Sequence, residues 1–261
     1  LMVDEGRRPF DLKTGPLFRA QLLRLAPEEH VLQLTVHHIV ADGWSLGVLS
    51  KDLTDLYAAA VGASPEIGPP PARYTDLMRR QRQRLTGTTY DAQAAYWRDR
   101  FTPPPPVLEL PGDHPRPTIQ TFDGGIEAFV LPSALAGALH RLGREQGVTL
   151  FMILLAALDV LLHRYTGLDD IAVGTPIANR TDVEAEKVVG LFANTLVLRA
   201  DLSGDPTVRE LLRRVRDVAL GAYAAQEFPF ERLVEMVQPV RDMSHSPLFQ
   251  VMLILQNAPF E

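Results

Sequence analysis

Residues 31–45 decide the fold, and their sequence is VLQLTVHHIVADGWS. Apolar and polar side chains alternate over Leu32–His37, a pattern typical of a β-strand with one buried face. After Ala41-Asp42-Gly43 the apolar residues recur at helical spacing, which predicts a helix over about Ser45–Ala60. The stretch therefore predicts a strand over Val31–Val40 that passes through a short turn into a helix.

Two adjacent histidines stand at the end of this predicted strand, where catalytic groups are common. Because strand side chains alternate, His37 and His38 are predicted to face opposite sides, so only one of them can face a given pocket. His38 shares the face of the preceding apolar residues, which would keep its imidazole neutral, as a general base requires. Asp42 would order the loop through an ion pair, and Gly43 would let a substrate approach closely. A buried histidine with a purely structural role is the alternative, and this stretch leaves both open.

Other chemistries fit this stretch less well. Two histidines on opposite faces cannot chelate one ion, and the chain has neither cysteine nor an HExxH motif, so no metal site is expected. Ser45 could be a hydrolase nucleophile, but the Gly-x-Ser-x-Gly elbow is missing. No glycine-rich phosphate loop is present, since Gly124-Gly125 stands alone.

The composition limits the classes of partner. The 261 residues are 46% hydrophobic and 22% charged, an ordinary globular composition that excludes a disordered chain, a collagen and a coiled coil. A net charge of -6 offers no basic field for nucleic acid or an anionic membrane. No apolar run approaches the ~20 residues of a membrane span, and no signal peptide opens the chain. We therefore expect a cytoplasmic protein with no nucleic-acid or membrane partner.

The remaining patterns predict a mixed α/β fold in two parts. A run at Leu17–Leu25 is predicted to form a hairpin with the strand at Val31–Val40, and a long helix is predicted over Tyr74–Arg100. Residues 102–118 include four consecutive prolines and predict an extended connection. Four strands and four helices are predicted beyond it: strands at Ile126–Leu131, Ile171–Thr175, Thr195–Ala200 and Phe249–Leu255, and helices at Pro132–Gln146, Leu150–Tyr165, Thr207–Ala225 and Phe230–Val237.

The motif around the histidines resembles a known signature. His37–Ser45 is similar to the HHxxxDG motif of condensation domains in nonribosomal peptide synthetases, which other acyltransferases of the chloramphenicol acetyltransferase-like superfamily share. Further motifs of the family follow in order: Tyr74–Asp76 resembles Tyr-x-Asp, Val189–Thr195 resembles Gly-x-Phe-x-Asn-Thr, Gln226–Glu231 ends in Pro-Phe-Glu, and Arg241–Leu248 resembles Arg-Asp-x-Ser-x-x-Pro-Leu. The matches depart from the usual pattern at Leu77–Arg79, Ala225, Glu227, His245 and Ser246.

The resemblance implies two chloramphenicol acetyltransferase-like lobes that form a V-shaped pseudo-dimer with a tunnel between them. Residues 1–101 would be the second half of the N-terminal lobe, 102–118 the linker, and 119–261 the first part of the C-terminal lobe. Because the opening motifs of the family do not precede Leu1, and the last predicted strand needs neighbours, we expect a piece of a longer polypeptide.

The resemblance also implies an activity, the formation of a peptide bond in the biosynthesis of secondary metabolites such as antibiotics. An acyl or peptidyl thioester on an upstream carrier protein would meet an aminoacyl thioester on a downstream one, with an adenylation domain in the same synthetase. The substrates would ride on the 4'-phosphopantetheine of the carrier proteins, and this chain would bind no cofactor itself. The sequence after Asp42 resembles domains that join an L-donor to an L-acceptor. An acyltransferase with a free acceptor and a non-catalytic carrier-docking module remain as alternatives.

The resemblance assigns roles residue by residue. His38 would accept or orient the amine proton or stabilise the tetrahedral intermediate, and the Gly43 backbone amide would help the oxyanion. His37, Asp42 and Arg241 would be structural, with an Asp42–Arg241 ion pair that orders the site. Three further residues would line the substrate channel: Trp44, Ser45 and Asn194.

Overall fold

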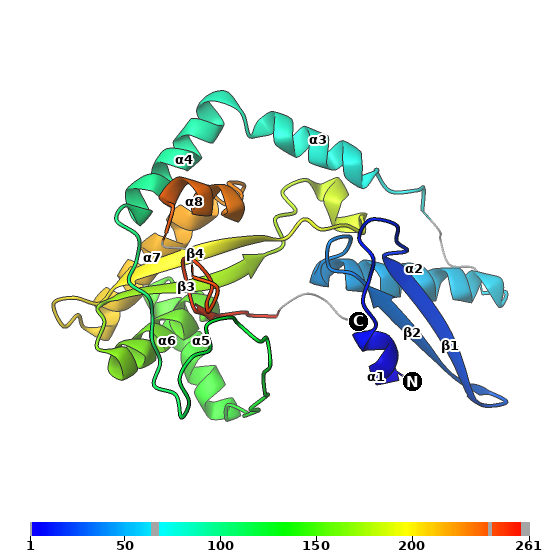
Figure 1. Ribbon diagram of the computed structural model, residues 1–261, viewed down its shortest axis with the longest axis horizontal. Coiled ribbons are helices and arrows are strands. Elements are labelled where there is room, and N and C mark those ends of the chain that lie inside the picture. Colours follow the sequence, from blue (N-terminus) through cyan, green and yellow to red (C-terminus); the bar gives the residue numbers. More distant parts are fainter. Residues whose placement is uncertain (1, 64–67, 240–241, 257–261) are drawn as a thin grey trace. The chain divides into compact units, whose positions relative to one another are not determined.

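The computed structural model describes residues 2–63, 68–239 and 242–256. These residues group into two compact units, the first within 1–83 and 178–193 and the second within 84–177 and 194–256. The chain therefore passes from the second unit into the first at residues 178–193 and then returns to the second (Figure 1). The domain bounds expected at 1–101 and 119–261 stay a prediction. The two units are defined by contacts within the chain, whereas the expected domains are lobes of the family fold.

The first unit is built on the predicted hairpin. Strand β1 (Phe18–Ala26) pairs antiparallel with β2 (Glu29–Val36), and the short helix α1 (Met2–Arg7) packs against β2 (Figure 1). Helix α2 (Gly43–Ala60) starts two residues before the predicted helix and ends with it. The unit also holds most of α3 (Tyr74–Arg84) and the short 3-10 helix η1 (Val183–Lys187).

Strand β2 ends four residues earlier than predicted, at Val36. The next residues form a turn, in which the Val40 amide donates to the His37 carbonyl (3.1 Å). The Ile39 amide donates to Nδ1 of the His37 ring (3.0 Å), so this side chain holds the turn from within. The prediction of a strand up to Val40 is therefore wrong, and strand alternation does not determine which way His37 and His38 face.

The second unit is a three-stranded sheet covered by helices. Strand β3 (Asp170–Ile177) is central, pairing antiparallel with β4 (Asn194–Asp201) and parallel with β5 (Val251–Met252). The helices are α4 (Gly87–Phe101), α5 (Ser133–Gln146), α6 (Leu150–Thr166), α7 (Val208–Ala224) and α8 (Phe230–Val237). Four of them agree with the prediction within one residue at each end. The single helix predicted over Tyr74–Arg100 is instead α3 and α4, separated where Gly87 takes a φ of +55°.

Both faces of this sheet are covered. Ile171 and Val173 of β3 and Leu196 of β4 have no exposed surface. Ala172, which lies between the two β3 residues, is buried too. Helix α7 packs on β4, α6 packs on β3 and against α7, and α8 packs on β4 and against α4 (Figure 1). A continuous buried run is typical of a strand with helices on both sides. The core of the protein lies here.

Two predicted strands differ from the structure. Residues Ile126–Leu131 form no strand, and side chains there are solvent-exposed, with Ile126 97% exposed. The strand predicted over Phe249–Leu255 is limited to the two residues of β5, which pair with Val173 and Gly174. Backbone amides and carbonyls form a strand only where a partner takes up their hydrogen bonds, and within the described residues these segments have little or none. The proline-rich residues 102–118 contain neither helix nor strand, as predicted.

Among the described residues, no single helix is long and apolar enough to cross a membrane. Helices α5 and α6 meet that criterion only when taken together, and the chain bends by 103° between them.

Candidate functional site

The centre of the first unit is Asp42, which ends the turn after β2 and begins α2. Its backbone is extended, and its Oδ1 accepts a hydrogen bond from the Ser45 amide (2.9 Å). This is the ordinary use of an aspartate before a helix, where the first amides have no partner within the helix. The cap explains why the helix starts at Gly43.

Asp42 is also half of a buried ion pair. Its Oδ1 lies 2.8 Å from Nη2 of Arg180, and the two side chains are 3% and 2% exposed. Arg180 also donates to the carbonyls of Ala185 and Val188, and its guanidinium lies over the Phe192 ring, 4.2 Å from the centroid. A buried charge needs such compensation, because removing one partner leaves the other unpaired away from water.

The same contacts set the protonation state of Asp42. Burial by itself raises the pKa of this carboxyl, but hydrogen bonds from the Ser45 hydroxyl and amide, the Phe192 amide and Arg180 more than offset burial. The pKa of Asp42 is therefore lowered from its ordinary value. Asp42 is an anion at neutral pH, which suits a structural ion pair and not a proton donor.

The two histidines differ in environment. His37 is half-buried, with its ring edge-on to Phe10 (5.6 Å between centroids) and its amide donating to the Leu17 carbonyl (2.9 Å). His38 is exposed, and within the described residues its ring makes no hydrogen bond or ion pair. The expectation that apolar strand residues surround His38 is wrong, because the strand has ended and Leu32 and Leu34 are themselves exposed. His38 is thus accessible on a turn that other residues hold.

Gly43 and Trp44 form the first turn of α2. Gly43 is exposed, and a side chain at this position would meet no atom within 4 Å, so the space around its Cα is open. Trp44 is half-buried, and its Nε1 donates to the Glu186 carbonyl (3.0 Å). The N-terminus of α2, to which the Gly43 amide belongs, is the feature here that a substrate could use, since the first amides of a helix attract negative charge.

The other predicted site residues lie elsewhere. Ser45 is fully buried within the Asp42 network. Asn194 belongs to the second unit, where its Nδ2 donates to the carbonyls of Gln226 and Phe228 and its Oδ1 accepts from the amides of Thr195 and Phe230. Arg241 lies outside the described residues, so the Asp42–Arg241 pair stays a prediction; the arginine that the structure brings to Asp42 is Arg180.

Arg180 was not singled out from the sequence. A buried carboxylate requires a partner, but the chain has many arginines, and nothing local marks the one that follows β3. The usable signal was the Gly-x-Phe motif at residues 190–192, because the Gly190 carbonyl and the Phe192 amide also bind in this network.

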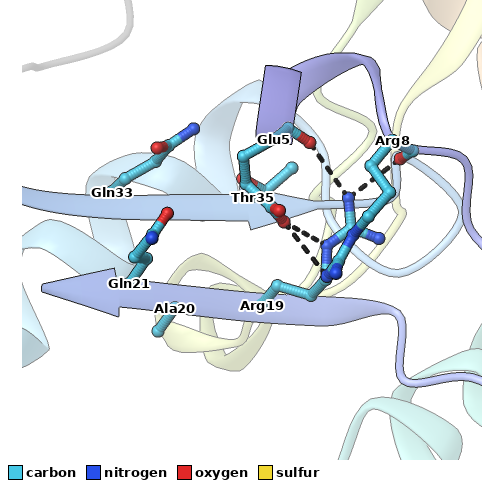
Figure 2. Close-up of a pocket in the computed structure, with 7 residues that line it drawn as sticks. All are labelled: Glu5, Arg8, Arg19, Ala20, Gln21, Gln33 and Thr35. Carbon is cyan, nitrogen blue, oxygen red and sulfur yellow. Dashed lines mark hydrogen bonds and ion pairs between the residues drawn. The ribbon is translucent and has the colours of Figure 1, made fainter. Parts of the chain in front are cut away.

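A cavity of about 230 Å³ in the first unit lies apart from these residues. It is lined by Glu5, Arg8, Arg19, Ala20, Gln21, Gln33 and Thr35 (Figure 2). Its charged groups are paired with each other, since Glu5 bridges to both Arg8 (3.3 Å) and Arg19 (2.5 Å). No predicted site residue lines it. Among the described residues, no three His, Asp or Glu side chains gather as metal ligands would.

The motifs and this geometry agree with a known family. A sequence profile described as "Condensation domain" matches residues 1–261. The chain belongs to the condensation-domain family. The chain is 47% identical over 262 residues to one of the linear gramicidin synthase proteins of Brevibacillus parabrevis, covering all of this chain and 3% of that protein. It is 44% identical to phosphinothricin tripeptide synthetase PhsB of Streptomyces viridochromogenes, covering 98% of this chain and 21% of the relative.

Solved condensation-type structures share the fold. The X-domain from teicoplanin biosynthesis matches with a TM-score of 0.86 at 30% identity, over 95% of this chain and 57% of that one. A four-domain nonribosomal peptide synthetase bound to AMP and glycine matches with a TM-score of 0.85 at 26% identity, over 97% and 19%. The mixed α/β fold of the chloramphenicol acetyltransferase-like type is thereby confirmed. The chain spans a small part of these curated relatives and little more than half of the X-domain.

Proposed function

We propose that this condensation domain forms a peptide bond between an acyl or peptidyl thioester donor and an aminoacyl thioester acceptor. The observation that supports the proposal best is the accessibility of this stretch: the imidazole of His38 is exposed and the space around the Gly43 Cα is open, while the buried Asp42–Arg180 pair holds the chain between them. Holding one accessible base on a fixed support is what a reaction between two tethered substrates needs.

The proposed step requires no covalent enzyme intermediate. The acceptor amine attacks the donor carbonyl, the carbon–sulfur bond breaks, and the donor thiol leaves with the proton that the amine loses. His38 takes or orients that proton, which is worth typically 10²–10⁴-fold in rate. The Gly43 amide donates to the oxygen of the tetrahedral intermediate.

The remaining residues support this arrangement in the proposal. His37 holds the turn through the Ile39 amide, and Asp42 anchors it through Arg180. Trp44 is the channel residue of the first unit, since its side chain is only half-buried while its indole nitrogen is fixed on the Glu186 carbonyl. Ser45 has its hydroxyl engaged within the first unit, so its part is to shape the site there. The channel role of Asn194 stays a prediction, and its amide binds backbone groups within the second unit.

The proposed partners are an upstream and a downstream carrier protein with phosphopantetheine-borne substrates, and an adenylation domain of the same synthetase. The relatives named gramicidin synthase and tripeptide synthetase, and the four-domain synthetase that shares the fold, support this assignment. The sequence after Asp42 supports the L-donor, L-acceptor subtype.

The test uses the full polypeptide that carries this sequence, with loaded donor and acceptor carriers, and follows the acceptor-bound product by intact mass. His38→Ala is expected to lower the rate of product formation by roughly 10²–10⁴-fold. His140→Ala, an exposed histidine of the second unit, is the matched control and should react like the native protein. Equal rates for native and His38→Ala proteins would remove His38 from the mechanism.

A docking function is the second candidate. The teicoplanin X-domain, which shares this fold with a TM-score of 0.87, is known in complex with OxyB. If the native polypeptide binds its carriers but forms no product, docking takes the place of condensation. If it acylates a free amine or alcohol instead, the acceptor is not a carrier-borne one.

A further inference from the structure

We propose that Ser45 is a positioning residue, whose hydroxyl fixes the segment around Gly190 to the turn that carries His38 and Gly43. The inference rests on the proposed condensation activity and adds a residue to its machinery. Ser45 would touch no substrate, because its side chain has no exposed surface.

The hydroxyl of Ser45 is used to its full capacity. Its oxygen accepts hydrogen bonds from the Gly190 amide (3.0 Å) and from Nη2 of Arg180 (3.0 Å). Its proton is shared between Oδ1 of Asp42 (2.7 Å) and the Gly190 carbonyl (2.9 Å). A hydroxyl has one proton and two lone pairs, so nothing is left for a ligand. Ser45 therefore acts on the protein, and the four contacts show where.

Gly190 is the point at which the segment 178–193 is held. Both polar groups of this residue bond to Ser45, and its carbonyl also accepts from the Asp42 amide (3.3 Å). On its other side lies the ring of Tyr74, so close that a Cβ at position 190 would overlap it. The Tyr74 hydroxyl donates to the next carbonyl, of Leu191 (2.8 Å). The backbone at Gly190 is thus hydrogen-bonded to Ser45 and packed against the ring of Tyr74.

These contacts of Gly190 matter for the site because the same segment, residues 178–193, supplies the partners of Asp42. Arg180 and the Phe192 amide bind the two carboxylate oxygens of Asp42, and both lie within a dozen residues of Gly190. Asp42 in turn ends the turn that begins with the histidines. A displacement of about 1 Å in such a support can cost up to 10²-fold in rate. Loss of the Ser45 hydroxyl should therefore slow the chemistry and leave carrier binding unaltered.

Three variants separate the hydrogen bonds from packing. Ser45→Ala removes the hydroxyl, Ser45→Cys keeps the branching of the side chain with a larger sulfur that makes only weak hydrogen bonds, and Ser50→Ala changes an exposed serine of the same helix. Single-turnover transfer between loaded carriers gives a rate constant and an amplitude, the latter reporting the active fraction. We expect roughly tenfold to hundredfold lower rate constants for Ser45→Ala and Ser45→Cys, with native amplitudes and native KM for the acceptor carrier, and no change for Ser50→Ala.

Hydrogen exchange supplies a measurement that does not need activity. Without the Ser45 hydroxyl the Gly190 amide loses its acceptor, so exchange in residues 188–193 should speed up at least tenfold in Ser45→Ala and stay native in Ser50→Ala. Unchanged exchange in Ser45→Ala would overturn the proposal. So would a native rate constant with an amplitude that falls with the folded fraction. If His38→Ala is inactive while Ser45→Ala is native in both measurements, this inference fails and the proposed function stands.

Discussion

The two units of this molecule are organised around different kinds of centre. In the first unit the deeply buried groups include a polar set, namely Ser45 and the side chains of the Asp42–Arg180 pair, beside a small apolar cluster of Leu77, Ala185, Val188 and Phe192. In the second unit a continuous apolar cluster surrounds the sheet and includes Trp97, Phe101 and Val215. Apolar packing is tolerant of rearrangement, whereas a buried polar network fails when one member is removed.

The two sheets differ in the same way. In the hairpin, Leu22 lies opposite Leu32 and Ala20 opposite Leu34, so that the apolar residues share one face, and the three leucines are exposed. In the second unit, the strand residues on both faces are buried. The first unit therefore gains little from apolar burial in its sheet, and the polar network bears more of its organisation.

The largest expected effect is the loss of Arg180. Arg180→Met leaves the Asp42 carboxylate buried without its charge partner, which costs about 3–5 kcal/mol. The chain has two tryptophans, Trp44 in the first unit and Trp97 in the second, so urea unfolding followed by fluorescence in single-tryptophan variants reports each unit. The Trp44 transition should move to lower urea. Arg213→Met, which breaks an exposed pair with Asp217, should cost at most about 1 kcal/mol.

A smaller effect sharpens the contrast between the sheets. Leu198→Ala, at a residue 1% exposed in β4, should cost about 2–5 kcal/mol, because it removes packed atoms and leaves a cavity. Leu22→Ala, at a residue 65% exposed in β1, should change the free energy of unfolding by less than about 0.5 kcal/mol. Denaturant titration of both variants checks the pair. A cost for Leu22→Ala equal to that for Leu198→Ala would show that its face is covered.

The third prediction concerns an exception within the apolar core. Asp159 of α6 has no exposed surface, and within the described residues neither of its carboxyl oxygens has a hydrogen-bond partner. Burial raises the pKa of Asp159 to about 8. Since the folded pKa lies above the unfolded one, the folded protein binds more protons than the unfolded chain between about pH 4 and pH 8. The contribution of the Asp159 carboxyl to the free energy of unfolding is complete below this window and is lost as pH rises through it.

Asp159→Asn removes this titration and keeps the shape of the side chain. The free energy of unfolding of the variant, relative to the native protein, should rise with pH by up to about 1.4 kcal/mol per pH unit across the window. Urea unfolding at several pH values between 4 and 8 measures the slope. Asp123→Asn, a substitution at an exposed aspartate, is the matched control. A constant difference between native and Asp159→Asn proteins would mean that the carboxyl is ionised in the fold.

How far the sequence predicts this structure depends on the range of the interaction involved. Helix α8 agrees with the prediction to the residue, and α2 differs only by two residues at its start, because periodicity and caps are local properties. The hairpin is also predicted, although β2 ends four residues before its predicted end. Residues Ile126–Leu131 have a strand pattern and form no strand, since pairing depends on a partner that the pattern does not contain. The same holds for most of Phe249–Leu255.

The site shows the same division. The sequence predicts an ion pair for Asp42, and the structure contains one, with Arg180 as the partner. Which arginine it meets depends on how distant segments fold, and no local feature distinguishes Arg180. The exposure of His38 follows from the end of β2 at Val36 and from the turn that begins after it.

The path of residues 178–193 also sets an order of events during synthesis. Asp42 leaves the ribosome 138 residues before Arg180, and at about 5–20 residues per second this delay is roughly 7–28 s. During that time the strand that precedes Arg180 is made, although it belongs to the other unit. A nascent chain with the hairpin and α2 already formed would keep its Asp42 carboxylate hydrated until the arginine arrives. The first unit, although its synthesis starts earlier, is thus completed only after much of the second unit has been made.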